Sequence, residues 1–323
     1  FKKCFSRQKA KNRPFKELIP FTLLAPDSRF FFNTKFVLNF WQLTSFGSIF
    51  QSIKRNDFHE PDIFYIDNIF YSFLMNKIYA NKKLFRVMDK HDGFPGWKDH
   101  VLTLAKTIVS LSDITIFSAK NLLSYVKELG SDDSIYIPNG IELKKFSKIL
   151  PQPTEYEKLS GFKAIYVGAL DKWINLEWIF KAARSLPEVT FIIIGPGEHI
   201  ESKFKNVDNI KYLGPIESNR IVPYLQWADL GLIPFDVAKY KSLINTVNPI
   251  KLYEYLAAGI PVISSRWDAE ELTNSPAILV GSSEEFIDAI RFSINSDRKS
   301  NPNVELYDWK KILDKNLKPI LIQ

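Results

Sequence analysis

Residues 248–265 read NPIKLYEYLAAGIPVISS, and their local chemistry predicts a short helix followed by a buried strand. Asn248 is a residue type that caps helix N-termini, and Pro249 suits the first helical position, where its missing N–H costs nothing. Gly259 supplies the left-handed residue that ends helices, and Pro261 prevents the helix from continuing. A helix that leads directly into an apolar strand is typical of α/β folds with parallel sheets.

Lys251 and Glu254 are three residues apart in this helix, which places them on one side of it and close to its positive end. A lysine there adds to the helix dipole, which disfavours helix stability and favours the binding of an anion. The alternative is a solvated Lys/Glu pair, as most such pairs on helices are. This stretch by itself favours the solvated pair over an anion-binding site. The rest of the sequence is needed to choose between the two interpretations.

Length and composition exclude several classes of protein. At 323 residues, of which 46% are hydrophobic, the chain is long enough for two domains with substantial cores. The single cysteine, Cys4, excludes an intramolecular disulfide framework and a cysteine-based zinc site, and it fits a reducing compartment. The histidines lack metal-ligand spacing, and no apolar run reaches the roughly 18 residues of a membrane-spanning helix.

The net charge of +7 is unevenly distributed. Basic residues precede the first acidic residue, Glu17, and they are Lys2, Lys3, Arg7, Lys9, Lys11, Arg13 and Lys16. Aromatic and apolar groups follow closely in residues 18–50. This arrangement is typical of a protein that rests on an anionic membrane surface, and equally of a chain whose aromatics form a core and whose lysines confer solubility. No recognition motif accompanies the charge, so nucleic-acid binding ranks last.

Short β-rich runs alternate with helical patterns along the first half of the chain, which predicts a parallel sheet covered by helices. We expect strands at 63–66, 84–88, 114–117 and 134–137, and helices at 97–112 and 119–129. The segment 147–159 has neither the helical nor the strand period and contains two prolines, so we interpret it as a linker.

The second half repeats the pattern, and three of its strands lead into glycines. We expect strands at 164–167, 190–194, 210–213, 230–233 and 261–264, with helices at 176–185 and 220–227. The glycines Gly168, Gly195 and Gly214 then lie at the carboxyl edge of a sheet, where open α/β folds bind ligands. Two such units imply a cleft between two facing edges.

Phosphate-binding fingerprints are missing from both halves. The chain has no G-x-G-x-x-G, no G-x-x-x-x-G-K-[ST], and no Asp-x-Asp spacing that would hold a divalent ion beside a diphosphate. We therefore expect a site without metal or cofactor, in which lysine, arginine and helix N-termini neutralise a diphosphate. Under this expectation, Lys251 is a candidate residue for binding the diphosphate.

An ordered set of motifs in the second half resembles the donor-binding domain of a GT-B glycosyltransferase of the broad family 4 type. The set comprises AIYVGAL (164–170), FIIIGPG (191–197), NIKYLGPI (209–216), IVPYLQWADLGLIPF (221–235) and NPIKLYEYLAAGIPVISS (248–265). The first half matches less densely, through FRVMDKHDGFPGW (85–97) and SIYIPNGIE (134–142). The resemblance is strongest to sugar transferases of capsule, teichuronic-acid and exopolysaccharide synthesis, including glucuronosyltransferases.

The resemblance implies an α/β GT-B fold of two Rossmann-like domains with a cleft between them. We expect an acceptor-side domain at 1–147, a nucleotide-sugar domain at 148–305, and a C-terminal helix at 306–323 that crosses back to the first domain, with Trp309 as a packing anchor. The chain begins at Phe1, so we expect the first strand of the family, with its glycine-rich loop, to be missing from it.

The resemblance also assigns roles to residues of the donor site. Glu254 matches the residue that accepts hydrogen bonds from both ribose hydroxyls, and Lys251 matches a residue beside the diphosphate. The strand-end glycines Gly168 and Gly195 would let the backbone approach the donor. The turn that contains Gly214 and Ile216 lies where the base packs in the family.

Two positions depart from the family pattern. Retaining members commonly carry a second glutamate eight residues before the ribose-binding one, and this chain has Thr246 there, which leaves inversion open. An arginine often follows the first donor-domain glycine, and this chain has Ala169. Lys172 would supply that charge, or it is a solvated loop lysine.

An inverting enzyme needs a general base near the acceptor hydroxyl, and the loop after the strand 84–88 offers three candidates. In related enzymes an aspartate or a histidine of this loop has that role. We place Asp92 or Asp89 first and His91 third. The alternative is a loop aspartate that caps the next helix.

These residues together predict sugar transfer from a nucleotide-diphosphate donor, a UDP-sugar above all, to a lipid-linked or polysaccharide acceptor on the cytoplasmic face of the membrane. Two alternatives stay open: a nucleotide-sugar epimerase of similar architecture, and a non-catalytic membrane-associated scaffold. A dinucleotide oxidoreductase ranks lower because the glycine fingerprint is missing.

Overall fold

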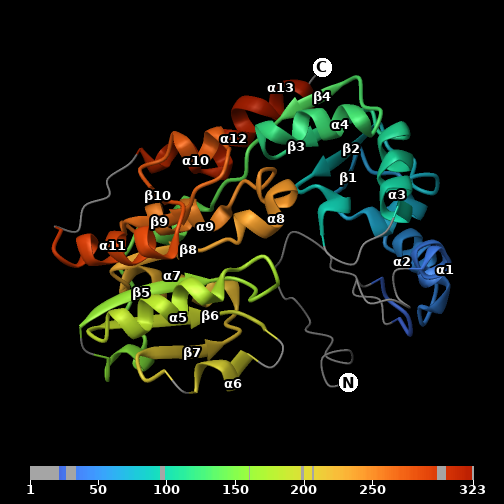
Figure 1. The fold of residues 1–323 in the computed structure, drawn as a ribbon. Helices are drawn as coiled ribbons and strands as arrows, with labels where there is room; N and C mark the ends of the chain where they lie inside the picture. Colours follow the sequence, from blue (N-terminus) through green and yellow to red (C-terminus); the bar gives the residue numbers. More distant parts are fainter. Residues whose placement is uncertain are drawn as a thin grey trace. The chain divides into compact units, whose positions relative to one another are not determined.

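The computed structural model describes residues 22–26, 34–94, 99–159, 161–197, 200–205, 207–296 and 303–321. The basic stretch at residues 2–16 lies outside the described residues. Backbone contacts divide the chain into two compact units, each an α/β structure around its own sheet (Figure 1). The first unit comprises Phe1–Phe117 and Leu122–Ile135, and the second comprises Ser118–Asn121 and Tyr136–Gln323.

The first unit contains a four-stranded sheet in the order β1-β2-β3-β4, whose first three strands pair in parallel. The strands are β1 (Ile63–Ile66), β2 (Lys82–Val87), β3 (Ile114–Phe117) and β4 (Ser134–Tyr136). All four side chains of β3 are buried, as expected of a strand with both faces covered. The four strand predictions for this half are confirmed to within two residues at each end.

The first unit also contains helices, two of which precede the sheet in the chain. They are α1 (Lys35–Phe40), α2 (Ile49–Arg55), α3 (Asp99–Ser110) and α4 (Leu123–Glu128), with 3-10 turns η1 (Trp41–Thr44), η2 (Ile69–Leu74), η3 (His91–Gly93) and η4 (Lys120–Leu122). The α3 face that carries Val101, Ala105 and Ile108 is buried, which gives this amphipathic helix its position. Neither α1 nor α2 was predicted from the sequence.

The second unit contains a six-stranded, entirely parallel sheet in the order β10-β9-β8-β5-β6-β7. Its strands are β5 (Phe162–Val167), β6 (Val189–Ile194), β7 (Ile210–Gly214), β8 (Leu230–Ile233), β9 (Val262–Ser265) and β10 (Ile278–Val280). The chain winds outward from β5 in one direction and, after β7, continues from β8 in the other. The carboxyl ends of β5 and β8 therefore flank the point where the strand order reverses, which is where ligands bind in such sheets.

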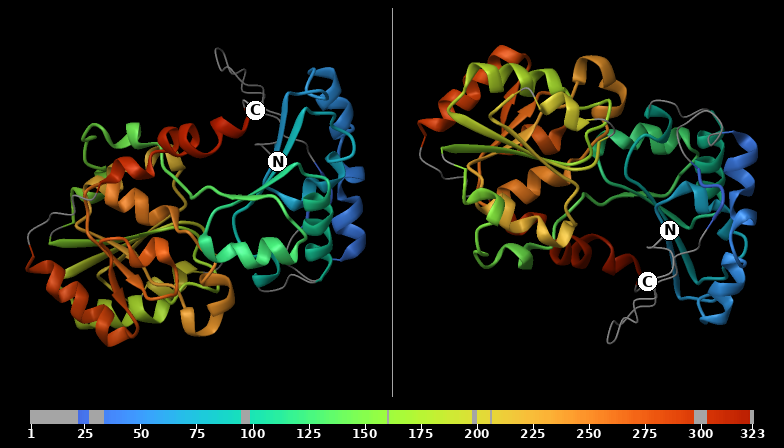
Figure 2. Two further views of the ribbon diagram at one scale, coloured as in Figure 1. Left: turned by 90° about the horizontal axis from the view of Figure 1, so that it is seen from above. Right: turned by 90° about the horizontal axis from the view of Figure 1, so that it is seen from below.

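Helices cover the sheet of the second unit (Figures 1 and 2). The helices of this unit are α5 (Leu176–Ser185), α6 (Ile200–Phe204), α7 (Val222–Gln226), α8 (Val237–Ile244), α9 (Ile250–Ala257), α10 (Glu270–Thr273), α11 (Ser283–Ile294), α12 (Trp309–Asn316) and α13 (Lys318–Leu321), of which the last two belong to the C-terminal segment. The remaining 3-10 turns are η5 (Leu143–Phe146), η6 (Thr154–Tyr156), η7 (Ser218–Arg220) and η8 (Val304–Tyr307). The sequence predicted α5, α7, α9 and the C-terminal helix α12, but not α6, α8, α10, α11 or the edge strand β10.

The segment 147–159 is not a free linker. Tyr156 has no exposed surface, and its hydroxyl donates to the carbonyl of Tyr224 on α7 at 3.0 Å. The Trp227 indole N–H donates to the carbonyl of Leu150 at 2.8 Å. Aperiodic sequence is equally compatible with a loop that packs along a helix, and the buried tyrosine shows that this segment does so.

The segment 136–147 also packs with the second unit, whereas the predicted boundary lay at 147/148. The N–H of Ile141 donates to the carbonyl of Tyr307 at 2.8 Å, and the N–H of Trp309 donates to the carbonyl of Ile141 at 2.9 Å. Gly140 makes this approach feasible, because an added Cβ would lie 3.0 Å from the Trp309 ring. The start of α12 is thus anchored to residues 140–141, and its predicted crossing to the first domain stays a prediction.

Candidate functional site

The three strand-end glycines meet at the carboxyl edge of the second sheet. The N–H of Gly168 donates to the carbonyl of Ile194, and the N–H of Gly195 donates to the carbonyl of Gly214, both at 2.9 Å. Gly195 has a φ of +146°, and a Cβ added there would lie 1.9 Å from the carbonyl oxygen of Gly168. Only glycine fits this position, because a side chain would force the ends of β5 and β6 apart.

The helix α9 starts later than expected, and the prediction that Asn248 caps it is wrong. Pro249 occupies the N-cap position, without a side-chain cap. Asn248 is buried, and its side chain accepts a hydrogen bond from the Tyr253 hydroxyl at 2.6 Å and donates to the Ser118 carbonyl at 2.8 Å. These tertiary hydrogen bonds take the place of the local cap. Gly259 has a φ of +77°, as predicted for the residue that ends the helix.

Lys251 lies in the first turn of α9, against the end of β5. Its Nζ is 3.3 Å from the Tyr166 hydroxyl, 4.4 Å from the centre of the Tyr166 ring and 5.2 Å from the centre of the Phe235 ring. A Cβ on Gly168 would lie 2.8 Å from the same Nζ. Burial lowers the pKa of Lys251 to about 8, although the Glu254 charge opposes this shift. The amine is therefore mostly charged at neutral pH.

Glu254 lies one turn further along α9. Burial raises the pKa of its carboxyl, and the charges of Lys251 and Lys145 oppose this shift. No residue in the described part of the chain donates a hydrogen bond to this carboxylate. Its oxygens therefore have lone pairs available for hydroxyl groups of a ligand.

A pocket of about 260 Å³ opens beside Glu254. Its lining includes Ile250 from the same helix face, Ser218 and Ile221 from the segment after β7, and Lys145. Glu142 also lines this pocket, so two carboxylates, one ammonium group, a hydroxyl and apolar side chains border one cavity. This combination suits a ligand that carries both a diol and a flat apolar group.

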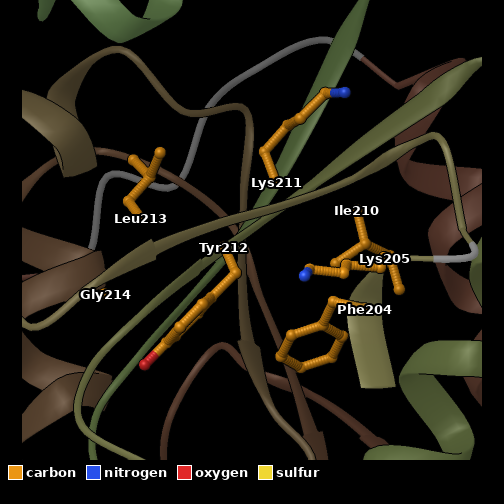
Figure 3. Close-up of a pocket in the computed structure, with 7 residues that line it drawn as sticks. All are labelled: Phe204, Lys205, Ile210, Lys211, Tyr212, Leu213 and Gly214. Carbon is orange, nitrogen blue, oxygen red and sulfur yellow. The ribbon is translucent and has the colours of Figure 1, made fainter. Parts of the chain in front are cut away.

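A second pocket, of about 460 Å³, lies along the edge strand β7 (Figure 3). Lys211 and Leu213 point to one side of the strand and Tyr212 to the other. The Tyr212 hydroxyl donates to the Gly195 carbonyl at 2.8 Å, which supports the strand-end turn. Gly214 borders this pocket, whereas Lys251 and Glu254 do not line it. The larger pocket is therefore not where the predicted donor-binding residues gather.

The remaining donor-side candidates have different surroundings. Ile216 is partly buried against the core of the second unit. Lys172 is exposed in the loop after β5, and no contact seen in the described ranges joins its ammonium group to Lys251 or Glu254. Thr246, at the position of the second family glutamate, is buried, and its hydroxyl donates to the carbonyl of Leu243 at 2.7 Å.

The loop after β2 in the first unit carries the three candidate bases. Burial raises the pKa of Asp89 to about 6 and lowers the pKa of His91 to about 4, in the latter case against the Asp92 charge. The Nδ1 of His91 is 3.2 Å from the Tyr125 hydroxyl. Asp92 is exposed, with its carboxylate 4.0 Å from the ammonium group of Lys90. At neutral pH, Asp89 is ionised and His91 is neutral, so both are able to accept a proton.

Sequence reasoning missed the residues that contact the two charged side chains of α9. The rings of Tyr166 and Phe235 lie beside the Lys251 ammonium group. The positive charge of Lys145 acts on the Glu254 carboxylate and lowers its pKa, against the effect of burial. Strand alternation could have identified Tyr166, because it lies two residues before Gly168 and so shares its side of β5. Nothing in the local pattern points to Phe235 or Lys145.

Residues 161–296, within the second unit, match the family described as "Glycosyl transferases group 1". Two similar curated proteins are from Bacillus subtilis (strain 168). "Putative teichuronic acid biosynthesis glycosyltransferase TuaH" is 26% identical over 148 residues, which are 44% of this chain and 36% of that protein. "Putative teichuronic acid biosynthesis glycosyltransferase TuaC" is 25% identical over 178 residues, 53% of this chain and 43% of that protein. The chain thus matches less than half the length of either relative.

Solved structures resemble the chain over most of its length. Sucrose-phosphate synthase from Thermosynechococcus elongatus has a TM-score of 0.63 at 16% identity, covering 82% of this chain and 73% of that one. Anabaena Alr3699/HepE, solved in complex with UDP-glucose, has a TM-score of 0.55 at 16% identity, covering 78% and 74%. The predicted fold class is confirmed. The chain has the GT-B fold of two parallel-sheet α/β domains, and it resembles glycosyltransferases of the family 4 type.

Proposed function

We propose that the protein is a glycosyltransferase that moves a hexosyl or glucuronosyl group from a UDP-sugar to a lipid-linked or polysaccharide acceptor in cell-surface polysaccharide synthesis. The observation that carries this proposal is the position of Lys251 and Glu254. Both residues lie on the first turns of α9, Lys251 at the carboxyl end of β5 and Glu254 at a pocket with polar and apolar walls. The similarity to the two teichuronic acid proteins supports the class of acceptor.

The donor would be held by charge and hydrogen bonds without a metal ion. Lys251 and the N-terminal N–H groups of α9 would face the diphosphate, and Gly168 would let the backbone approach it. The Glu254 carboxylate would accept one hydrogen bond from each ribose hydroxyl, in the pocket beside Ser218 and Ile221. The UDP-glucose bound by HepE supports a uridine diphosphate donor.

The reaction breaks the bond between the sugar and the diphosphate and forms a bond to an acceptor hydroxyl. Negative charge grows on the departing diphosphate, where the Lys251 ammonium group would stabilise it. Asp89, Asp92 or His91 would accept the proton of the acceptor hydroxyl.

Calorimetric titration with UDP tests the donor site directly. We expect Glu254→Gln to weaken UDP binding by about tenfold to a hundredfold, because hydrogen bonds to a charged group contribute about 1.5–3 kcal/mol. The matched control is Glu188→Gln, since Glu188 is exposed in the turn before β6, at the opposite end of the sheet. Equal UDP affinity in the wild type and Glu254→Gln would rule out the ribose assignment.

An assay of the UDP-sugar without acceptor separates the competing activities. A glycosyltransferase needs the acceptor for transfer, whereas an epimerase would convert the donor sugar alone. Conversion without acceptor would therefore replace the proposed reaction with epimerisation. Absence of both UDP binding and donor turnover would favour a non-catalytic scaffold.

A further inference from the structure

One helix of the first unit has apolar side chains on two sides. Val37 and Trp41 face inward and are 1% and 4% exposed. Phe36, Phe40 and Leu43, at spacings of four and three residues, are 67%, 47% and 73% exposed. The rings of Phe36 and Phe40 are 5.4 Å apart, so the exposed groups form a continuous stripe along α1 and η1. We call Phe36, Phe40 and Leu43 the apolar stripe.

The stripe lies on an outer helix of the unit. Figure 2 shows α1 and α2 along the side of the first unit, next to α3, and α1 contacts α3 and η2 with its inner face. The inner face thus already supplies the packing that holds the helix in place. Large apolar side chains gathered on the opposite face expose surface to water that monomeric proteins usually bury, and such patches mark interaction sites.

The surroundings of the stripe carry positive charge. Residues 34–56 contain Lys35, Lys54 and Arg55 and no acidic residue. Beside Leu43 a pocket of about 240 Å³ includes Lys77, whose Nζ is 5.7 Å from the centre of the Phe50 ring. An ammonium group is therefore held next to the exposed stripe by aromatic contacts.

We propose that the apolar stripe docks on an anionic lipid bilayer. The side chains of Phe36, Phe40 and Leu43 would enter the boundary between headgroups and acyl chains, and Lys35 and Lys77 would face lipid phosphates. Charge complementarity selects this occupant, because the cations beside the stripe match an anionic headgroup layer. The proposal names a surface of the first unit and does not depend on the donor site in the second.

A vesicle flotation experiment tests the docking. The full chain is mixed with vesicles that contain phosphatidylglycerol or with vesicles of phosphatidylcholine alone. We expect the wild type to float with the anionic vesicles, and Phe36→Ser/Phe40→Ser/Leu43→Ser to bind them at least about tenfold more weakly, because binding strength follows the buried apolar area. The control Ile149→Ser/Phe292→Ser/Leu306→Ser removes residues of similar exposure, 76%, 68% and 66%, from the second unit and should bind like the wild type.

A charge variant keeps the proposal testable if the triple serine variant folds poorly. Lys35→Glu/Lys77→Glu leaves the stripe intact and should reduce binding to anionic vesicles by a similar factor, with added salt weakening the wild type in the same direction. Equal binding of the wild type to neutral vesicles would overturn the role of charge. Equal binding of the triple variant and the wild type to anionic vesicles would overturn the stripe as the docking surface.

The UDP titration keeps this inference separate from the proposed function. Neither triple variant changes a residue of the donor site, so their UDP affinity should equal that of the wild type. Loss of flotation with normal UDP binding supports the docking surface. A wild type that binds UDP but floats with no vesicle overturns the docking proposal and leaves the donor site standing.

Discussion

At the scale of single residues, the burial of Lys251, a proposed ligand of the diphosphate, works against the stability of the fold. Its ammonium group lies against Tyr166 and Phe235, and burial lowers its pKa to about 8 from the ordinary 10.5. The folded state thus holds this proton less tightly than the unfolded state does. The unfolding free energy is therefore reduced below pH 8, and the loss disappears as the pH rises toward 10.5.

We expect Lys251→Met to raise the unfolding free energy by on the order of 3 kcal/mol below pH 8 and by little above pH 10.5, because each unit of pKa shift corresponds to about 1.4 kcal/mol. The same variant should weaken UDP binding by about tenfold or more through loss of the charge. Urea denaturation at several pH values and calorimetric titration measure the two effects. Lys158→Met, at an exposed lysine before β5, is the control and should change neither. A destabilised Lys251→Met at pH 7 would contradict the burial cost.

Asp89 gives a second prediction at the residue scale. Burial raises the pKa of this carboxyl to about 6. If Asp89 is the general base, turnover should rise with pH through about 6, because only the ionised carboxylate accepts a proton. Asp89→Asn should then lose turnover by at least about a hundredfold while UDP affinity stays unchanged.

The pH profile of kcat measures this rise in turnover around pH 6. Asp132→Asn, at an exposed aspartate of the same unit, is the control. A profile that is flat between pH 5 and 8, together with near-normal turnover of Asp89→Asn, would remove Asp89 from the chemistry. Asp92 and His91 would then be tested in the same way. Because the pKa of His91 is about 4, we expect kcat to rise with pH near 4 if His91 is the base.

At the scale of elements, the ends of β5 and β6 approach so closely that one glycine decides the geometry. A Cβ on Gly195 would lie 1.9 Å from the Gly168 carbonyl oxygen, so the two strand ends would have to separate. We expect Gly195→Ala to lower the unfolding free energy by about 2 kcal/mol or more, as overpacking does, and to weaken UDP binding. Chemical denaturation and UDP titration measure these effects.

The matched control is Gly259→Ala at the end of α9. Gly259 also has a positive φ, +77°, but no atom lies within 4 Å of its added Cβ. Only the conformational cost of about 1–2 kcal/mol then applies, and UDP binding should stay normal. Equal UDP affinity in Gly195→Ala and Gly259→Ala would show that the approach of the strand ends does not shape the donor site.

At the scale of the whole molecule, each unit has its own sheet and its own buried residues. A ligand stabilises only the unit that binds it, by RT ln(1 + [L]/Kd), or about 2.7 kcal/mol at a hundredfold excess over Kd. We therefore expect scanning calorimetry to resolve two transitions, of which saturating UDP raises only one. At the same UDP concentration Glu254→Gln should show a smaller increase, because its UDP affinity is expected to be about tenfold to a hundredfold lower. A single transition that UDP raises as a whole would instead show that the two units unfold together.

The sequence by itself determined the α/β class, the strands of both sheets to within about two residues except β10, and the positions of Gly168, Gly195, Lys251 and Glu254 at strand or helix ends. These features follow from hydrophobic period, glycine and proline, which act over a few residues. Only the tertiary structure showed that the Asn248 side chain does not cap α9 and instead forms hydrogen bonds with Tyr253 and Ser118. It also showed that α1 has apolar side chains on both its buried and its exposed face. Burial and long-range hydrogen bonds decide such outcomes, and both depend on residues that are distant in the chain.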